Sequence, residues 1–221
     1  MGLPENIYKE VTKLTGELIE AGLCDVQSYP ILRTVGHKTC EITFSEDHDL
    51  AYILKNIPYN EVYEEIKRNK SYNLYMADGG IIQIQYLVRD GEIIKHRLAF
   101  FPSPSLEEYQ NNPDIYENDE IYADVLMKNV VTSPIRFDFD REAFVEGSHP
   151  MSHLTIGQYK NCRIPVGGPI SPYLFLHFVL SSFYNTAYNK CSNSLTVFEC
   201  SYSSTITTSE ARNIHIMASF K

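Results

Sequence analysis

The chain has 221 residues, of which 43% are hydrophobic and 21% are charged, and its formal net charge at pH 7 is −9. This composition excludes an intrinsically disordered chain, and the length is sufficient for one globular domain with a sizeable core. The five cysteines are widely spaced, and no pair has the C-x-x-C spacing of zinc ribbons or redox motifs. We therefore expect a cytoplasmic protein with reduced thiols.

Membrane association is not expected. The chain opens on MGLPE, without the basic and apolar regions of a secretion signal. The longest apolar run, residues 174–180, is interrupted by a histidine and is too short to span a bilayer.

The negative charge is unevenly distributed. Seven of the 28 acidic residues lie within residues 105–124, which contain no Lys or Arg. The remaining 21 acidic residues nearly balance the 19 Lys and Arg residues. A local patch could therefore bind nucleic acid, although the overall charge does not favour it.

The first 70 residues are expected to be mainly helical. Apolar residues at spacings of four, three and four predict one helix that ends at Gly22 (Ile7, Val11, Leu14 and Leu18). Ser45 is suited to cap a second helix, which Pro58 would end, and a third helix is expected over residues 60–69.

A three-stranded antiparallel meander is expected over residues 71–101. Strands at 72–77, 80–88 and 92–100 are separated by Asp78-Gly79 and Asp90-Gly91, and Asp-Gly is a strong hairpin signal. Residues 102–133 then form an acidic loop region.

The last part of the chain, residues 134–221, is expected to alternate strands with one helix. Short strands are predicted at 134–140, 153–157 and 162–166, and further strands near 195–202 and 211–218. Ser171 followed by Pro172 favours a helix start, and the helix after it is apolar nearly all round, as in a buried helix. The sequence therefore predicts a single α+β domain over residues 1–221, with N-terminal helices packed on a mainly antiparallel sheet and one buried helix near the C-terminus.

Residues 136–140, with the sequence RFDFD, alternate polar and aromatic side chains. On a strand this pattern places Arg136, Asp138 and Asp140 on one face. The two carboxylates would be roughly 6.6 Å apart at the backbone and could converge on one Mg²⁺ or Mn²⁺ ion, as in phosphodiester chemistry. The alternative is an ordinary solvated face on which Arg136 or Arg163 forms structural salt bridges with the acids.

Two histidines and a second arginine complete the candidate site. In an extended chain His149 and His153 would be roughly 13 Å apart, which is too far for one metal ion, although a turn at Pro150 could bring them together. We expect one of them, by preference His153, to act as a general base or a phosphate contact. Arg163 is suited to clamp a phosphate. The alternative for each histidine is a hydrogen bond to a backbone carbonyl group at a turn.

Four segments together resemble a bacterial family known as domain of unknown function 2290: RFDFD at 136–140, HPMSHLTIG at 149–157, CRIPVGGPISP at 162–172 and FLHFVLSSFY at 175–184. The resemblance covers most of the chain. It implies a cytosolic protein of bacteria or their mobile elements, of the kind found among defence or toxin genes. A fainter likeness links the strands and the histidine-containing turn to small toxins of toxin–antitoxin loci. Neither resemblance assigns a catalytic residue.

Two functional hypotheses follow. In the first, the protein is an effector with a metal-assisted, nuclease-like phosphodiesterase site: Asp138 and Asp140 hold the metal, His149 or His153 transfers the proton, and Arg163, with Arg136, binds the phosphate. In the second, it is a non-catalytic adaptor or accessory subunit that binds a partner protein of the same locus through the acidic residues 105–124 and the tyrosine-rich strands. The first hypothesis predicts that these side chains share one pocket, and the second predicts that they disperse into separate salt bridges.

Overall fold

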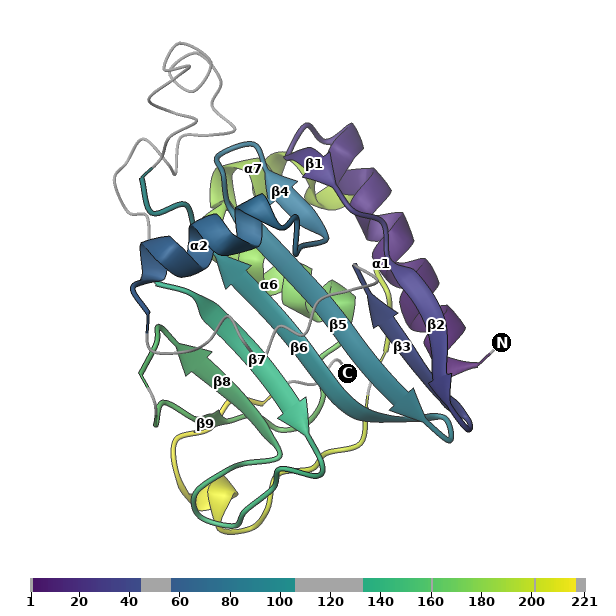
Figure 1. The fold of residues 1–221 in the computed structure, drawn as a ribbon, viewed down its shortest axis with the longest axis vertical. Coiled ribbons are helices and arrows are strands. Elements are labelled where there is room, and N and C mark those ends of the chain that lie inside the picture. Colours follow the sequence, from purple (N-terminus) through teal and green to yellow (C-terminus); the bar gives the residue numbers. More distant parts are fainter. Residues whose placement is uncertain (1, 45–56, 106–132, 160, 201, 218–221) are drawn as a thin grey trace.

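The computed structural model describes residues 2–44, 57–105, 133–159, 161–200 and 202–217. Within them, nine strands form one antiparallel sheet in the order β1-β4-β5-β6-β7-β8-β9, and β3 pairs with β5 and with β2 (Figure 1). The strands are β1 (Cys24–Gln27), β2 (Ile31–Gly36), β3 (Thr39–Thr43), β4 (Leu74–Met76), β5 (Ile81–Arg89), β6 (Glu92–Phe101), β7 (Ile135–Asp140), β8 (Ser152–Ile156) and β9 (Ile164–Pro165).

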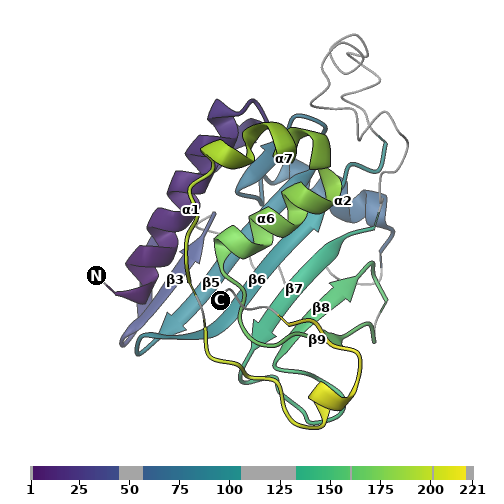
Figure 2. The ribbon, with the colours of Figure 1, turned by 180° about the vertical axis from the view of Figure 1, so that it is seen from behind.

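Helices cover the two faces of the sheet unequally. The helices α1 (Leu3–Glu20), α6 (Pro172–Phe183) and α7 (Asn185–Cys191) lie on one face, as Figure 2 shows from behind. Among the described residues, the only helix on the opposite face is α2 (Tyr59–Arg68), which crosses one end of β5 and β6 (Figure 1). Each face has its own apolar cluster, and the cluster under α2 includes Ala99 and Phe101 of β6. No described helix covers the remainder of that face, over β6, β7 and β8, and polar side chains lie there.

The predicted α+β class is confirmed. The four residues of the first helical stripe are all buried in α1, at most 2% exposed. Ser171 caps α6, because its hydroxyl accepts a hydrogen bond from the Leu174 N–H, and α6 is the expected buried helix. The predicted meander is β4, β5 and β6, paired antiparallel in chain order. Asp90 and Gly91 both have positive φ angles, 51° and 81°, as a two-residue type I′ hairpin requires.

The C-terminal strands predicted near 195–202 and 211–218 are wrong. The described residues there contain two 3₁₀ turns, Ser192–Ser194 and Glu210–Arg212, and a single parallel bridge between Val166 and Ile216. This segment is held by isolated hydrogen bonds, such as the one from the Gly167 N–H to the Ile216 carbonyl group at 2.7 Å. Its apolar residues pack against the core without a strand partner, and periodicity alone does not separate such a chain from a strand.

Three strands near the N-terminus, β1, β2 and β3, were not predicted. The expectation that residues 1–70 are mainly helical therefore missed these strands. β2 and β3 are joined by a tight turn in which Lys38 has a positive φ of 48°. That turn lacks the glycine that usually marks such a connection. The second predicted helix, which would begin at Ser45, and most of the acidic region lie outside the described residues.

No helix in the described part of the chain combines the length and the apolar character needed to cross a membrane.

Glu10 provides a test of how α1 packs against α6. Its carboxylate is 5% exposed and accepts a hydrogen bond from the Tyr173 N–H at 2.8 Å, in the first turn of α6. Burial raises the pKa of Glu10 from 4.5 to about 7, and the hydrogen bond offsets only part of this effect. The folded state therefore retains a proton that the unfolded state has lost, so this group makes the fold less stable as the pH rises through this window.

We predict that Glu10→Gln removes this pH dependence. The wild-type protein should lose up to about 3 kcal/mol of unfolding free energy from this group between about pH 5 and about pH 8, whereas the variant should not. Urea denaturation at both pH values measures the difference, and Glu5→Gln, at an exposed position of the same helix, is the control. Equal pH dependence in wild type and Glu10→Gln would contradict this packing.

Candidate functional site

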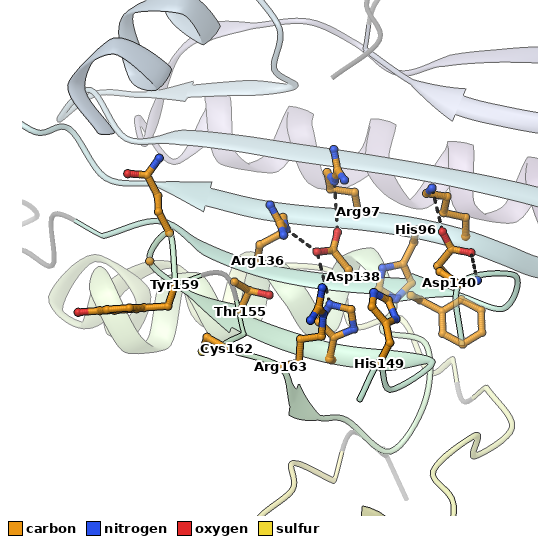
Figure 3. Close-up of a pocket in the computed structure, with 16 residues that line it drawn as sticks. His96, Arg97, Arg136, Asp138, Asp140, His149, Thr155, Tyr159, Cys162 and Arg163 are labelled. Atoms are coloured by element: carbon orange, nitrogen blue, oxygen red, sulfur yellow. Dashed lines mark hydrogen bonds and ion pairs between the residues drawn. The ribbon is translucent and has the colours of Figure 1, made fainter. Parts of the chain in front are cut away.

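A pocket of about 320 Å³ lies on the open face of the sheet, over β6, β7 and β8. Figure 3 shows its polar side chains gathered above these strands. Residues from two connections complete its wall: Ala143 and His149, which follow β7, and residues 157–159 and 162–163, between β8 and β9. Every residue that the sequence analysis assigned to the site lines this one pocket: Arg136, Asp138, Asp140, His149, His153 and Arg163.

The antiparallel register produces this arrangement. Arg97 of β6, Asp138 of β7 and His153 of β8 are register partners and form one row across three strands. Directly paired residues project from the same face of a sheet, so these three side chains must meet. Lys95 and Asp140 form the adjacent row on the same face. The alternating aromatic residues of β7, Phe137 and Phe139, are buried on the other face, at most 4% exposed.

Asp138 is the centre of the charge network. Arg97 Nε donates to Asp138 Oδ1 at 3.2 Å, and Arg136 Nε donates to Asp138 Oδ2. The three side chains are only 14% to 22% exposed. Burial opposes ionisation of Asp138, but the charges of Arg136 and Arg97 and the hydrogen bond from Arg136 outweigh it and lower the pKa of this carboxyl group. Asp138 is therefore ionised, and both of its oxygens are engaged.

Asp140 is also fully engaged. Its Oδ2 lies 2.9 Å from Lys95 Nζ, and its Oδ1 accepts hydrogen bonds from the N–H groups of Glu142 and Ala143 at 3.0 and 3.1 Å. Burial again opposes ionisation, and the hydrogen bond and charge of Lys95 overcome it, so the pKa of Asp140 is lowered.

This donor set does not fit the expected Mg²⁺ or Mn²⁺ ion. A metal on the two aspartates would have to displace the guanidinium groups and the ammonium group from their carboxylates, and would then lie beside those cations. Within the described residues, no three His, Cys, Asp or Glu side chains are grouped closely enough to hold a metal ion. The aspartates hold the cationic side chains in position instead.

The two histidines are close neighbours. The turn at Pro150 brings the rings of His149 and His153 to a centroid distance of 5.0 Å. His153 is 4% exposed, and its Nδ1 lies 3.1 Å from the Pro150 carbonyl oxygen. A carbonyl oxygen can only accept, so we assign the hydrogen to Nδ1 and leave Nε2 as the basic nitrogen.

His153 Nε2 is poised beside Asp138 without a hydrogen bond to it, since the distance to Asp138 Oδ2 is 3.9 Å. Burial lowers the pKa of His153, and the Asp138 charge opposes this effect only in part. The ring is therefore neutral at pH 7. The neighbouring His149 has a buried Nδ1 without a hydrogen-bond partner among the described residues.

Arg163 has a distinct role among the cations of the pocket. Lys95, Arg97 and Arg136 each form an ion pair with a carboxylate, whereas Arg163 forms none with a described residue. Its charge nevertheless acts on the site, because it contributes to the lowered pKa of both His153 and Arg136. The pocket thus has four cationic side chains and two carboxylates. Arg163 is the cation that could bind an anion without first leaving a carboxylate of a described residue.

Several lining residues were not predicted from the sequence: Lys95, Arg97, Thr155, Gln158 and Tyr159. The sequence does indicate that Lys95 and Arg97 lie on the same face of a strand, because they are two residues apart in a predicted strand. Only the pairing of β6 with β7 places that face opposite the two aspartates. Tyr159 follows the end of β8, where sequence gives no indication of its proximity to the arginines.

Comparison with known proteins identifies the family but no function. The family model described as "Uncharacterized conserved protein (DUF2290)" matches residues 23–218, so the chain belongs to this family. No curated protein and no solved structure matches the chain.

We predict that Asp138→Asn destabilises the fold by about 3 kcal/mol, because it leaves two partly buried guanidinium groups without their counter-charge. Chemical denaturation measures this loss. Glu142→Gln is the matched control, because it removes an exposed ion pair with Arg89 (69% and 45% exposed) and should cost less than about 1 kcal/mol. If the two variants lost the same stability, Asp138 would not be the centre of the network.

Proposed function

We propose that this member of the DUF2290 family binds a phosphate ester in the pocket and cleaves it by proton transfer to histidine. The observation that supports this proposal most directly is the cationic excess of the pocket, and in particular Arg163, which has no carboxylate partner among the described residues. The chain as a whole carries a net charge of −9, so this excess is a local property of the site.

Phosphate is the anion that best matches these donors. A guanidinium group offers two parallel N–H donors that fit two oxygens of a phosphate group. Arg97 and Arg136 remain held by Asp138 and add positive charge behind the ligand. Because the pocket is partly shielded from water, this charge is screened less than it would be on an exposed surface.

Histidine supplies the proton transfer. His153 is neutral at pH 7, and its basic Nε2 can accept the proton of an attacking hydroxyl group, from water or from the substrate itself. As the new bond to phosphorus forms, the bond to the leaving oxygen breaks, and a second acid must protonate that oxygen. His149 is the neighbouring imidazole and is assigned this role. Asp138, 3.9 Å from His153 Nε2, would stabilise the imidazolium as it forms.

This proposal replaces the metal-assisted mechanism considered from the sequence. There the two aspartates would hold the metal ion; here they neutralise and orient Arg97, Arg136 and Lys95. The change affects the expected cofactor requirement and leaves the assigned roles of His153 and Arg163 unaltered.

We predict cleavage of bis(4-nitrophenyl) phosphate or of oligonucleotides in the presence of EDTA. His153→Gln should lower kcat by roughly 10²- to 10⁴-fold, the usual range for the loss of a general base. Arg163→Gln should mainly raise KM.

We also predict that the rate persists into mildly acidic solution, because burial lowers the pKa of His153 below that of an ordinary histidine. The rate should fall once the pH drops through this lowered pKa, because the protonated ring can no longer act as a base.

His37→Gln is the control, since His37 is exposed on the turn between β2 and β3. Full activity of His153→Gln, or activity that depends on added Mg²⁺ and is lost in EDTA, would overturn the mechanism. If the wild-type protein neither binds nor cleaves any phosphate ester but co-purifies with a partner protein, the adaptor hypothesis is favoured instead.

A further inference from the structure

Tyr159 is an exposed aromatic side chain at the rim of the cationic pocket. It lines the pocket and is 77% exposed, the highest value among the large hydrophobic side chains that do so. In the view of Figure 3 its ring lies at one end of the group of lining residues, and Thr155 and Arg136 lie between it and Asp138. One ligand could therefore contact the ring and the cations together.

The turn that carries Tyr159 is anchored on both sides. Before it, the Gly157 N–H donates to the Pro134 carbonyl group at 2.7 Å, and Gly157 has a positive φ of 66° that favours glycine. After it, the Cys162 N–H donates to the Tyr159 carbonyl group at 3.1 Å, and Cys162 Sγ accepts from the Ile156 N–H at 3.4 Å. These contacts hold the backbone of Tyr159 and place its ring at the rim of the pocket.

A single exposed tyrosine is common on protein surfaces and needs no special explanation. Its combination with the neighbouring charges is more specific. An aromatic ring at the rim of a pocket that contains arginines matches one way in which proteins bind single-stranded nucleic acids: the ring stacks on a base and the cations bind the backbone phosphate. Inorganic phosphate would use the cations but would gain nothing from a stacking surface, whereas a nucleotide base offers a flat π-face that stacks on a tyrosine ring.

We propose that Tyr159 is a base-stacking platform and that the ligand of the pocket is an unpaired nucleotide within a single strand. This inference rests on the proposed function and names its substrate class. The base stacks on the Tyr159 ring while the adjoining phosphate meets Arg163. In a duplex the base is already stacked inside the helix and is out of reach of the ring unless it is flipped out.

The experiment compares a single strand that carries bases with the same strand without them. A fluorescein-labelled, cleavage-resistant phosphorothioate oligoadenylate is titrated with protein and followed by fluorescence anisotropy, as RNA and as DNA. The same strand made with abasic sugars retains the phosphates and removes the stacking partner. The duplex form of the DNA strand completes the set.

Tyr159→Ala should weaken binding of the oligoadenylate roughly 5- to 100-fold, the range that corresponds to one base–aromatic stack, and should leave binding of the abasic strand unchanged. Tyr159→Phe, which keeps the ring, should bind as wild type does. Tyr29→Ala, at an exposed tyrosine between β1 and β2, is the control for general loss of aromatic surface (49% exposed). The DNA duplex should bind more weakly than the single-stranded DNA oligoadenylate.

Equal affinity of wild type and Tyr159→Ala for the oligoadenylate would overturn the stacking proposal, and so would tighter binding of the duplex. If the abasic strand still bound, and lost affinity on Arg163→Gln, the proposed phosphate site would stand without the base subsite. If neither strand bound to the wild-type protein, both proposals would fail. Because the ring is largely exposed, its truncation is not expected to disturb folding.

Discussion

The antiparallel register of β6, β7 and β8 is the constraint from which the site follows. Pairing Arg97 with Asp138, and Asp138 with His153, places a cation, a carboxylate and an imidazole in one row on one face of the sheet. A slip of β7 by one residue against β6 would turn the polar residues of β7 into the apolar core and bring its aromatic residues to the surface. The burial of Phe137 and Phe139 therefore fixes the register, and the register assembles the charges.

The carboxylates support the site by holding cationic side chains. Three guanidinium or ammonium groups would repel one another on a bare sheet surface, and two of them are largely buried. Asp138 and Asp140 supply the counter-charge that keeps Arg97, Arg136 and Lys95 in place. Since Arg163 has no such partner among the described residues, it is the cation to which the proposed function assigns an external anion. Structural salt bridges and a ligand site, posed as alternatives from the sequence, are compatible under that proposal.

The sequence was sufficient for much of this architecture because the relevant signals are local. The helical stripe of α1, the Asp-Gly turns of the meander, the Ser-Pro start of α6 and the alternation of β7 each depend on residues within one element. The density of charged residues around β7 pointed to the part of the chain that forms the pocket. What the sequence lacked was partner information. Strand pairing brings Lys95 and Arg97 into the site, and the connection after β8 brings Tyr159 there. The C-terminal segment was predicted as strands from its apolar residues, but these residues have no strand to pair with.

The expectation of a metal site also depended on partners that the sequence does not reveal. Two carboxylates two residues apart on one strand are equally suited to a cation from solution and to cations of the protein, and their spacing does not distinguish these partners. The distinction depends on residues from β6, some 40 positions earlier in the chain. Once Arg97 and Lys95 are placed opposite the aspartates, the carboxylate oxygens are engaged by side chains of the protein, which is why we propose anion binding in place of metal ligation.

The most direct test of the central claim is an NMR titration of the histidine ring nitrogens with inorganic phosphate. If the pocket binds phosphate, the ring resonances of His149 and His153 should shift in a saturable manner, those of His37 and His215 should remain unchanged, and Arg163→Gln should weaken the saturation. Rings that respond equally throughout the protein, or rings of His149 and His153 that do not respond at all, would contradict the account.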